Sequence, residues 1–439
     1  MTINPLKKNK KLHVLTLAAV IFFTVSGGPF GLEPLLGYAG EHGIFLLLII
    51  TPLLWDIPAI LTILELNSMM PVTGGYYQWV KRALGPRWGF YEGWWTWLYT
   101  FVDLAIYPVL FVGYLSFFFP QLGDLRIPVC LAIVWSGAIL NILGISPVGK
   151  TTMLLSIFVI IPFIIAFVLA LQNPAHFTFP APSLKNISFP AMGMALYTVM
   201  WNFFGWDNAT TYAEEVDKPV RSYLRSTMIA FIAVMCIYVI VVYTTLRFHI
   251  DAGELNKDGF PALGVLAGGK WLGSSIAVGG MAGALGLFSS VLLSISRVPE
   301  VMAQDGFLPR KLQALHPKYN TPHVSIIVCA AVISFMILWS FEELIIIDVT
   351  LYGTSLFLEF VTLVVLRIKA PHEQRPFRVP LPIWGLMILY ILPVAVYAIA
   401  LSGALLSEEQ KFLPAVFAIG ALLSAELAWQ VMKWRKKIV

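Results

Sequence analysis

Charged residues are scarce in this sequence. Asp, Glu, Lys and Arg make up 12% of the 439 residues, while 58% are hydrophobic. A soluble globular domain has about 25% charged residues, so this composition is outside the soluble range. Only three cysteines are present, each alone in an apolar run (Cys130, Cys236 and Cys329), which excludes a disulfide framework. The composition therefore predicts an integral membrane protein.

Motifs of enzymes are also missing. The sequence has no phosphate-binding loop, no H-E-x-x-H zinc motif and no G-x-S-x-G nucleophile elbow in a suitable context. Its seven histidines show no metal spacing, and no soluble domain is large enough to hydrolyse ATP. The net charge of +5 comes from cations in short loops, which indicates orientation in a membrane and not nucleic-acid binding. We therefore expect no enzyme activity, catalytic residue, cofactor or metal.

Apolar runs of about 20 residues, long enough to span a bilayer, recur along the chain. The basic N-terminus and the run after it are typical of a secretory signal, but no small-residue cleavage site follows, so we retain this run as the first span. Basic residues concentrate at the N-terminus and in the even-numbered loops, which predicts that both termini are cytoplasmic. The twelve predicted spans are approximately 12–39, 44–67, 88–119, 127–143, 152–171, 191–213, 226–248, 274–302, 323–340, 344–368, 383–406 and 413–434.

The first predicted span is interrupted at 26–31 by Ser-Gly-Gly-Pro-Phe-Gly. Glycine permits dihedral angles outside the helical region and proline lacks an N–H group, so the helix should break here. Lipid cannot pair with the backbone groups that the break frees. Broken helices therefore lie buried in protein or line a watery cavity, and in secondary transporters they bind the substrate and the coupling ion.

A second interruption, Trp-Asn-Phe-Phe-Gly-Trp-Asp-Asn at 201–208, lies in the sixth span. It occupies about the position of the first break if the chain is read as two halves of five helices with opposite orientations. This arrangement predicts an all-α membrane protein with a 5+5 inverted repeat, in which the two broken helices face each other. The predicted divisions are a cytoplasmic tail at 1–11, repeats at 12–171 and 190–368, and two additional helices at 383–434.

The two breaks provide groups of opposite polarity. Free N–H groups of a half-helix that we expect to begin near Phe30 suit a carboxylate, and carbonyls around 25–27 and 203–205 suit an ammonium group. The glycines could instead serve only close helix packing. Together with neighbouring side chains, the candidate substrate-binding residues are Val25, Ser26, Gly27, Gly28, Phe30, Gly31, Glu33, Asp103, Tyr107, Trp201, Phe203, Phe204, Gly205 and Asp207.

Three acids lie at membrane depth: Glu33, Asp103 and Asp207. An ionisable group there is a functional-site hypothesis, and these could bind a cationic amine or carry protons. The structural alternative is capping or interhelical hydrogen bonding. Asp207 follows the second break, where an acid suits a helix N-cap, and we prefer the structural role for it and function for the other two. Glu65 and Glu359 lie nearer the predicted cytoplasmic ends, so we predict structural roles for both.

Further motifs follow in order along nearly the whole chain. They are Ser-Gly-Gly-Pro-Phe-Gly at 26–31, Glu-Leu-Asn-Ser-Met-Met-Pro at 65–71 with Gly-Gly-Tyr at 74–76, Gly-Pro at 85–86 with Gly-Phe at 89–90 and Gly-Trp at 93–94, Glu-Glu-Val-Asp-Lys-Pro at 214–219, and Ser-Arg at 296–297 with Met-Ala-Gln-Asp-Gly-Phe-Leu-Pro at 302–309. Together they resemble the amino acid–polyamine–organocation permeases. Residues 27–33 and 206–208 are most similar to the branch of the plant polyamine uptake transporters. The resemblance implies a leucine-transporter-type fold with broken helices 1 and 6, and alternating access for amino acids or amines.

The resemblance bears on the coupling ion as well. Proton-coupled relatives often place a lysine in the fifth span, and aligning 141–144 and Pro162 with that pattern puts Val159 at the position of the lysine. Ser289 and Ser290 could supply hydroxyl oxygens to sodium, although such residues usually serve packing. The branch resembled implies proton coupling first, with sodium or exchange second. The ion-coupling candidates are Glu33, Asp103, Ser289 and Ser290.

The sequence therefore predicts a secondary transporter that moves amino acids or related cationic amines across the cell membrane. Its expected partners are this substrate, a coupling ion and the lipid bilayer, with no nucleic acid. The alternatives are an exchanger, a sodium-coupled symporter, a channel, or a nutrient sensor that shares the fold without transport. The acids favour a cationic substrate, while the first break favours an amino acid carboxylate.

Overall fold

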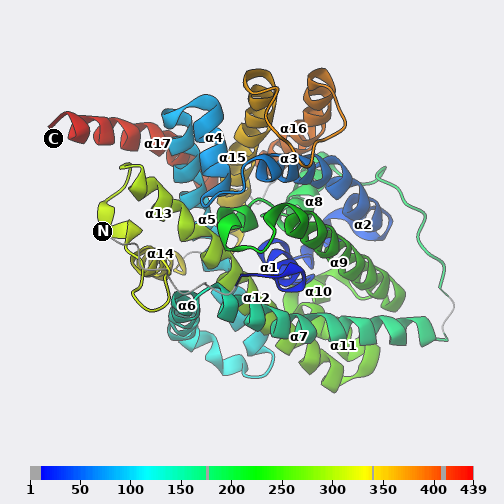
Figure 1. Ribbon diagram of the computed structural model, residues 1–439. Coiled ribbons are helices and arrows are strands. Elements are labelled where there is room, and N and C mark those ends of the chain that lie inside the picture. Colours follow the sequence, from blue (N-terminus) through cyan, green and yellow to red (C-terminus); the bar gives the residue numbers. More distant parts are fainter. Residues whose placement is uncertain (1–10, 175–176, 339–340, 407–411, 439) are drawn as a thin grey trace.

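The computed structural model describes residues 11–174, 177–338, 341–406 and 412–438 (Figure 1). In this part of the chain the secondary structure is helical, apart from two isolated β-bridges. The α-helices are α1 (Val14–Val25), α2 (Pro34–Leu54), α3 (Asp56–Met69), α4 (Gly75–Leu84), α5 (Pro86–Ser116), α6 (Arg126–Leu143), α7 (Ile145–Gln172), α8 (Phe189–Trp201), α9 (Pro219–Phe248), α10 (Ala252–Asp258), α11 (Phe260–Gly268), α12 (Lys270–Ile295), α13 (Arg297–Gln304), α14 (His323–Met336), α15 (Phe341–Lys369), α16 (Ile383–Leu405) and α17 (Phe412–Ile438). The short 3₁₀ helices are η1 (Pro120–Leu125), η2 (Asn208–Thr211), η3 (Ala213–Glu215) and η4 (Arg310–Gln313).

Eight helical stretches among the described residues are long and apolar enough to cross a membrane. Two further apolar helices, α1 and α14, are shorter. Each of the twelve predicted spans contains at least one helix, and both predicted interruptions are present. α1 ends at Val25 and α8 ends at Trp201. The chain is thus a multi-pass helical membrane protein with two interrupted helices.

The helix after the first break begins later than expected. It starts at Pro34, so the prediction that it begins near Phe30 is wrong. Gly31 has φ +93°, outside the helical region, whereas proline suits the first position of a helix because its missing N–H would be unpaired there in any case. α2 then continues past residue 39 through Gly40, whose φ of 62° separates the short half-helix from the next predicted span.

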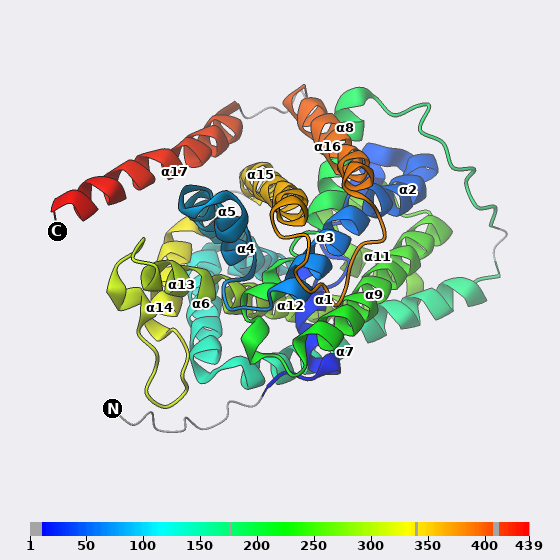
Figure 2. The ribbon, with the colours of Figure 1, turned by 45° about the horizontal axis from the view of Figure 1, so that its top comes forward.

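α12 forms the centre of the bundle. In the helical stretch Lys270–Gln304, which α12 forms together with α13, 83% of an apolar 18-residue segment is buried. Its small residues let neighbouring elements approach closely: the Cβ that Gly280 lacks would lie 2.5 Å from the Tyr114 ring, and that of Gly283 would lie 2.5 Å from the backbone oxygen of Gly27. Figure 2 shows α1 beside α7, α9 and α12, which surround it. α12 therefore holds the first break in the middle of the protein.

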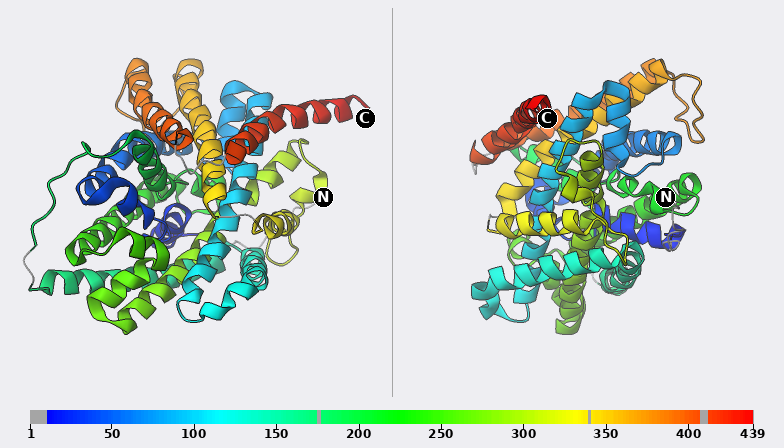
Figure 3. Two further views of the ribbon diagram at one scale, coloured as in Figure 1. Left: turned by 180° about the vertical axis from the view of Figure 1, so that it is seen from behind. Right: turned by 60° about the vertical axis from the view of Figure 1, so that its left-hand side comes forward.

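Other helices lie at the periphery. α17 packs against α5 and α15 at one end and projects away from the bundle at the other (Figures 1 and 3).

The short helix α4 carries Tyr77 and Lys81, which both contact Asp305 next to α13, at 2.5 and 2.6 Å. Burial and the adjacent Asp305 carboxylate raise the pKa of Tyr77, so its hydroxyl remains the donor in this contact.

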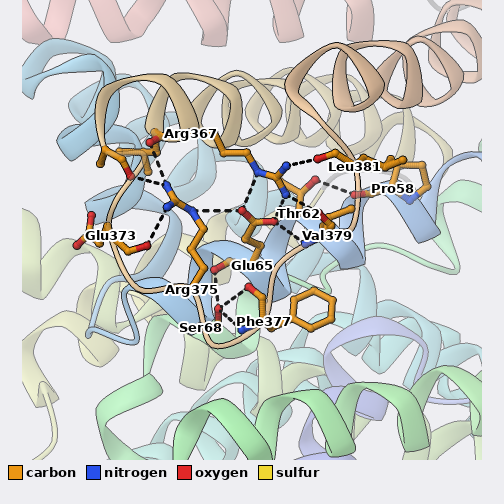
Figure 4. A network of polar contacts seen from close by, with 12 residues as sticks. Pro58, Thr62, Glu65, Ser68, Arg367, Glu373, Arg375, Phe377, Val379 and Leu381 are labelled. Carbon is orange, nitrogen blue, oxygen red and sulfur yellow. Dashed lines mark hydrogen bonds and ion pairs between the residues drawn. The ribbon is translucent and has the colours of Figure 1, made fainter.

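A buried ion-pair network joins α3 to α15 and to the loop that follows α15 (Figure 4). The carboxylate of Glu65 accepts hydrogen bonds from Nε and Nη2 of Arg367, at 2.8 and 2.5 Å, and from the N–H of Val379 at 2.8 Å. Arg375 adds a contact at 3.4 Å. Both oxygens of this buried acid are thus paired, which agrees with the structural role predicted for Glu65.

Candidate functional site

The first break is a compact turn that pairs most of its own N–H groups. The N–H groups of Ser26 and Gly27 donate to the carbonyl of Phe22, at 2.9 and 3.0 Å. The N–H of Gly28 donates to Oγ of Ser26 at 3.1 Å, and the N–H of Gly31 donates to Oε2 of Glu33 at 2.5 Å. The expectation that these N–H groups are free is therefore wrong for the paired residues, because the side chains of the turn occupy them.

The two breaks touch each other. Gly205 has φ +89°, and a Cβ on it would lie 2.5 Å from the carbonyl oxygen of Thr24, a distance that no real Cβ tolerates. On the other side, a Cβ on Gly31 would lie 2.4 Å from the ring of Trp201. Glycine at both positions thus lets the end of each interrupted helix approach the backbone of the other.

A tyrosine from a third helix also connects the breaks. The hydroxyl of Tyr238 on α9 lies 2.7 Å from Oγ of Ser26 and donates a hydrogen bond of 2.7 Å to the backbone oxygen of Asn202. The Tyr238 ring packs edge-on against Phe203, with ring centroids 5.0 Å apart. The buried hydroxyl of Tyr238 therefore contacts a side-chain oxygen of the first break and a backbone oxygen of the second.

A cavity lies between the two breaks, α5 and α15. Its volume is about 20 Å³, room for about one water molecule, and two acids, Asp103 from α5 and Asp348 from α15, line it. No lysine or arginine is among the lining residues of the described chain. The lining residues are Thr24, Val25, Ser26, Tyr99, Asp103, Tyr107, Trp201, Asn202, Phe204, Gly205, Asn208, Leu287, Asp348 and Tyr352.

The two acids of the cavity differ in their bonding. The hydroxyl of Tyr107, one turn along α5, lies 2.5 Å from each carboxyl oxygen of Asp103. Oδ1 of Asp348 is buried and has no hydrogen-bond partner among the described residues. Because a buried acceptor without a donor is costly, this oxygen suits a donor that arrives with a ligand.

Seven of the predicted substrate-binding residues line the cavity. They are Val25, Ser26, Asp103, Tyr107, Trp201, Phe204 and Gly205. The other seven lie outside its lining: Gly27, Gly28, Phe30, Gly31, Glu33, Phe203 and Asp207.

Glu33 and Phe30 belong to a neighbouring cluster. The hydroxyl of Tyr114 donates to Oε1 of Glu33 at 2.7 Å, while Oε2 accepts the N–H of Gly31. The ring of Phe30 packs against Tyr114 and Phe163, with centroids 4.9 and 5.5 Å apart. Glu33 thus accepts the hydrogen bond of the Gly31 N–H, which lies at the break where a substrate carboxylate was predicted to bind.

Asp207 bonds to another helix. Its Oδ1 accepts a hydrogen bond of 2.9 Å from the hydroxyl of Tyr352 on α15. The side chain forms no capping bond with the following helix, η2, in this part of the described chain. Of the two structural roles considered for Asp207, the interhelical hydrogen bond is thus present and the cap is not.

Ser289 and Ser290 lie on α12 about two turns after Gly283, which contacts the first break. The backbone oxygen of Ser289 accepts a hydrogen bond from the side chain of Asn141 at 3.1 Å. Oγ of Ser290 is buried without a hydrogen-bond partner among the residues described.

Val159, at the position of the lysine found in proton-coupled relatives, lies against Gly28, since a Cβ on Gly28 would come within 2.7 Å of it. An apolar side chain therefore faces the first break there.

Several lining residues were missed. Asp348 is an acid within an apolar run, which is the signal that identified Asp103, so it could have been found. Tyr99, Tyr352 and the bridging Tyr238 carry no such signal, because only the packing of distant helices places them.

Two interrupted helices around a central polar cavity are the arrangement of secondary membrane transporters. The comparison with known families agrees with this class: the amino acid permease family matches residues 12–422, and the chain belongs to that family.

Individual relatives extend over most of the chain. It is 33% identical over 420 residues to the polyamine transporter RMV1 of Arabidopsis thaliana, which covers 94% of this chain and 84% of the relative. It is 32% identical over 422 residues to the polyamine transporter PUT1 of Oryza sativa subsp. japonica, covering 95% and 78%. It is 25% identical over 390 residues to the serine/threonine exchanger SteT of Bacillus subtilis, covering 85% and 86%.

Proposed function

We propose that this transporter carries aliphatic polyamines, and that Asp103 and Asp348 bind their ammonium groups. The observation that carries the proposal is the pair of carboxyl groups in a cavity without a lysine or arginine among its described lining. A cation that enters this cavity loses water but gains the attraction of two negatively charged carboxylates. A substrate carboxylate that enters is repelled by the same two groups.

The first break supports the same substrate class. An amino acid needs donors for its carboxylate, and the N–H groups of Gly28 and Gly31 already donate to Ser26 and Glu33. Glu33 therefore acts as a built-in carboxylate in the place where a substrate carboxylate would bind. A di- or polyamine has only ammonium groups and needs no such donors.

The relatives point in the same direction, since two of them are named as polyamine transporters. We further propose twelve membrane spans with a 5+5 inverted repeat, both termini in the cytoplasm, a plasma-membrane location and proton-coupled alternating access. The two matched helix breaks and the basic loops support this topology. Amino acid exchange is the main alternative, and one relative is named as an exchanger.

Uptake by purified protein in liposomes tests the substrate class. Labelled putrescine and spermidine are compared with a panel of amino acids under an imposed proton gradient, with and without sodium. We expect saturable amine uptake that amino acids do not inhibit. Amino acid uptake with no amine transport or competition contradicts the proposal.

Variants of the cavity acids test their role. Each hydrogen bond to a charged group contributes about 1.5–3 kcal/mol, so Asp103→Asn and Asp348→Asn should weaken amine binding roughly 10- to 100-fold. The matched control is Asp258→Asn, which removes an exposed acid of α10 and should leave uptake unchanged. Equal amine affinity in both cavity variants and the control contradicts the assignment.

A further inference from the structure

A second group of acids lies outside the lining of the cavity. It consists of Asp207 after the second break, Glu359 on α15 and Glu92 on α5, and we call it the acid cluster. All three side chains are buried, with relative exposures of 4%, 1% and 0%. Tyr352, which lines the cavity, lies between the cavity and Asp207. The acid cluster is thus separated from the substrate cavity by one hydroxyl group.

Residues of α15 bring the three acids together. Glu359 lies on α15 seven residues after Tyr352 and four after Ser355, so these three side chains share one face of the helix. Tyr352 donates a hydrogen bond to Asp207, and Ser355 donates one to Glu92. Oε2 of Glu359 is buried and has no hydrogen-bond partner among the described residues. The acid cluster therefore offers an open acceptor for a proton on Glu359.

Glu92 provides a further open acceptor. Its Oε1 accepts a hydrogen bond of 2.5 Å from Ser355. Its Oε2 is buried and has no hydrogen-bond partner in the described part of the chain. Ser355 lies one turn of α15 before Glu359, so its bond to Glu92 places the two acids beside each other. A proton that leaves Glu359 thus has an unoccupied acceptor nearby.

No cation compensates these acids. Among the described residues, no lysine or arginine forms an ion pair with Asp207, Glu359 or Glu92. The buried Glu65 is the contrast within the same protein, since Arg367 and Arg375 pair with it. Buried acids without a counter-ion are neutralised by protons, because leaving several charges in a low dielectric costs far more.

Among the residues that the structure describes, the other titratable groups near the acid cluster are hydroxyls. They are Tyr76 of α4, Tyr99 of α5, Tyr352 of α15 and Tyr390 of α16. None of them is a base that could take the cluster's proton near neutral pH.

We propose that the acid cluster of Asp207, Glu359 and Glu92 is the proton-binding site of the transporter, distinct from the substrate cavity. This inference rests on the proton coupling proposed above and assigns it to residues that the sequence analysis placed in capping and structural roles or did not consider. The cluster binds one proton from one side of the membrane and releases the same proton to the other.

Tyr352 connects the bound proton to the second break. Its oxygen accepts the N–H of Gly205 at 3.2 Å, and its O–H donates to Oδ1 of Asp207 at 2.9 Å. If Asp207 takes a proton on Oδ1, that oxygen becomes a donor and a weaker acceptor, so the bond from Tyr352 weakens and a reoriented hydroxyl is favoured. The N–H of Gly205 bonds to the same Tyr352 hydroxyl, and Gly205 borders the cavity. Protonation of the cluster therefore changes the contacts of the break that holds the substrate.

The decisive experiment compares two readouts in proteoliposomes with labelled putrescine. One is accumulation driven by a pH gradient at zero membrane potential, and the other is counterflow at equal pH on both sides, which needs no net proton movement. In Glu359→Gln the amide keeps the size and polarity of the acid but cannot exchange a proton. We expect the ratio of gradient-driven uptake to counterflow to fall about 5- to 150-fold, the usual range of coupling between two sites.

Controls separate this proposal from the proposed function. Asp258→Asn, an exposed acid, should keep the wild-type ratio. A wild-type protein whose putrescine uptake does not respond to the pH gradient overturns proton coupling itself. A wild-type protein that responds, together with Glu359→Gln at the wild-type ratio, overturns the proton site alone.

A second variant covers the case in which Glu359→Gln does not fold. Asp207→Asn removes another acid of the cluster and is measured with the same two readouts. A lower ratio supports the proton site, and the wild-type ratio overturns it. Amine-induced proton movement, followed with a pH dye inside the liposomes, should be lost together with the ratio.

Discussion

Replacing Gly205 with alanine tests whether the two breaks must touch during transport. Gly205 has φ +89°, and the new Cβ would lie 2.5 Å from the carbonyl oxygen of Thr24 and 2.8 Å from the side-chain nitrogen of Asn208. The oxygen belongs to the backbone of the first break and cannot rotate away. The substitution therefore forces the two breaks apart or moves the second break.

The expected magnitude has two parts. An alanine in the left-handed region costs about 1–2 kcal/mol relative to the right-handed region. Overpacking a tight contact costs a further 1–3 kcal/mol or so. Since about 1.4 kcal/mol corresponds to tenfold in a rate or equilibrium constant, the overpacking alone predicts a fall in amine uptake of roughly 5- to 100-fold.

Gly269→Ala is the matched control, because Gly269 has φ +83° and nothing lies within 4 Å of the position of its Cβ. Initial uptake rates and melting temperatures of the two purified variants are compared with the wild type. Both should lose stability through backbone strain, but only Gly205→Ala should lose transport. Equal uptake in the two variants refutes the contact between the breaks as a requirement for transport.

Three further changes follow from the structure. Tyr238→Phe removes the hydroxyl that joins both breaks, and at about 1 kcal/mol for each of two hydrogen bonds uptake should fall about 30-fold; wild-type uptake contradicts the bridging role. Glu65→Gln leaves Arg367 buried without its counter-charge, which should cost about 3–5 kcal/mol and clearly lower the melting temperature in detergent. Asp305→Asn keeps an acceptor for Tyr77 at a partly exposed ion pair, so its cost should stay below about 1 kcal/mol; a loss equal to that of Glu65→Gln would show that this contact is also essential for stability.

The helices and their breaks could be predicted because lipid leaves the backbone few choices. An apolar run in a bilayer must be helical, and Gly-Gly-Pro within it must interrupt the helix. α1 accordingly ends at Val25, directly before the predicted interruption, and α8 ends at Trp201, the first residue of the second one. The start of the following half-helix at Pro34 was missed because it depends on the path of the turn.

The site could be predicted only in part. Asp103 stands out as a lone acid in an apolar run, and it lines the cavity. Glu33 carries the same signal but bonds to Tyr114 and to its own turn, which only the folded backbone determines. Tyr238 and Tyr352 reach the breaks from distant helices, and nothing in their local sequence separates them from tyrosines at a membrane surface.

The ion pair between Glu65 and Arg367 also affects the order in which the protein folds during its synthesis. The two residues are 302 positions apart. At a synthesis rate of about 5–20 residues per second, Glu65 enters the membrane about 15–60 s before Arg367 leaves the ribosome. During that interval α3 cannot take its final buried position without leaving an acid unpaired in the bilayer. The first part of the chain therefore completes its folding only after α15 has been made, and a nascent chain that stops before residue 367 should remain incompletely folded.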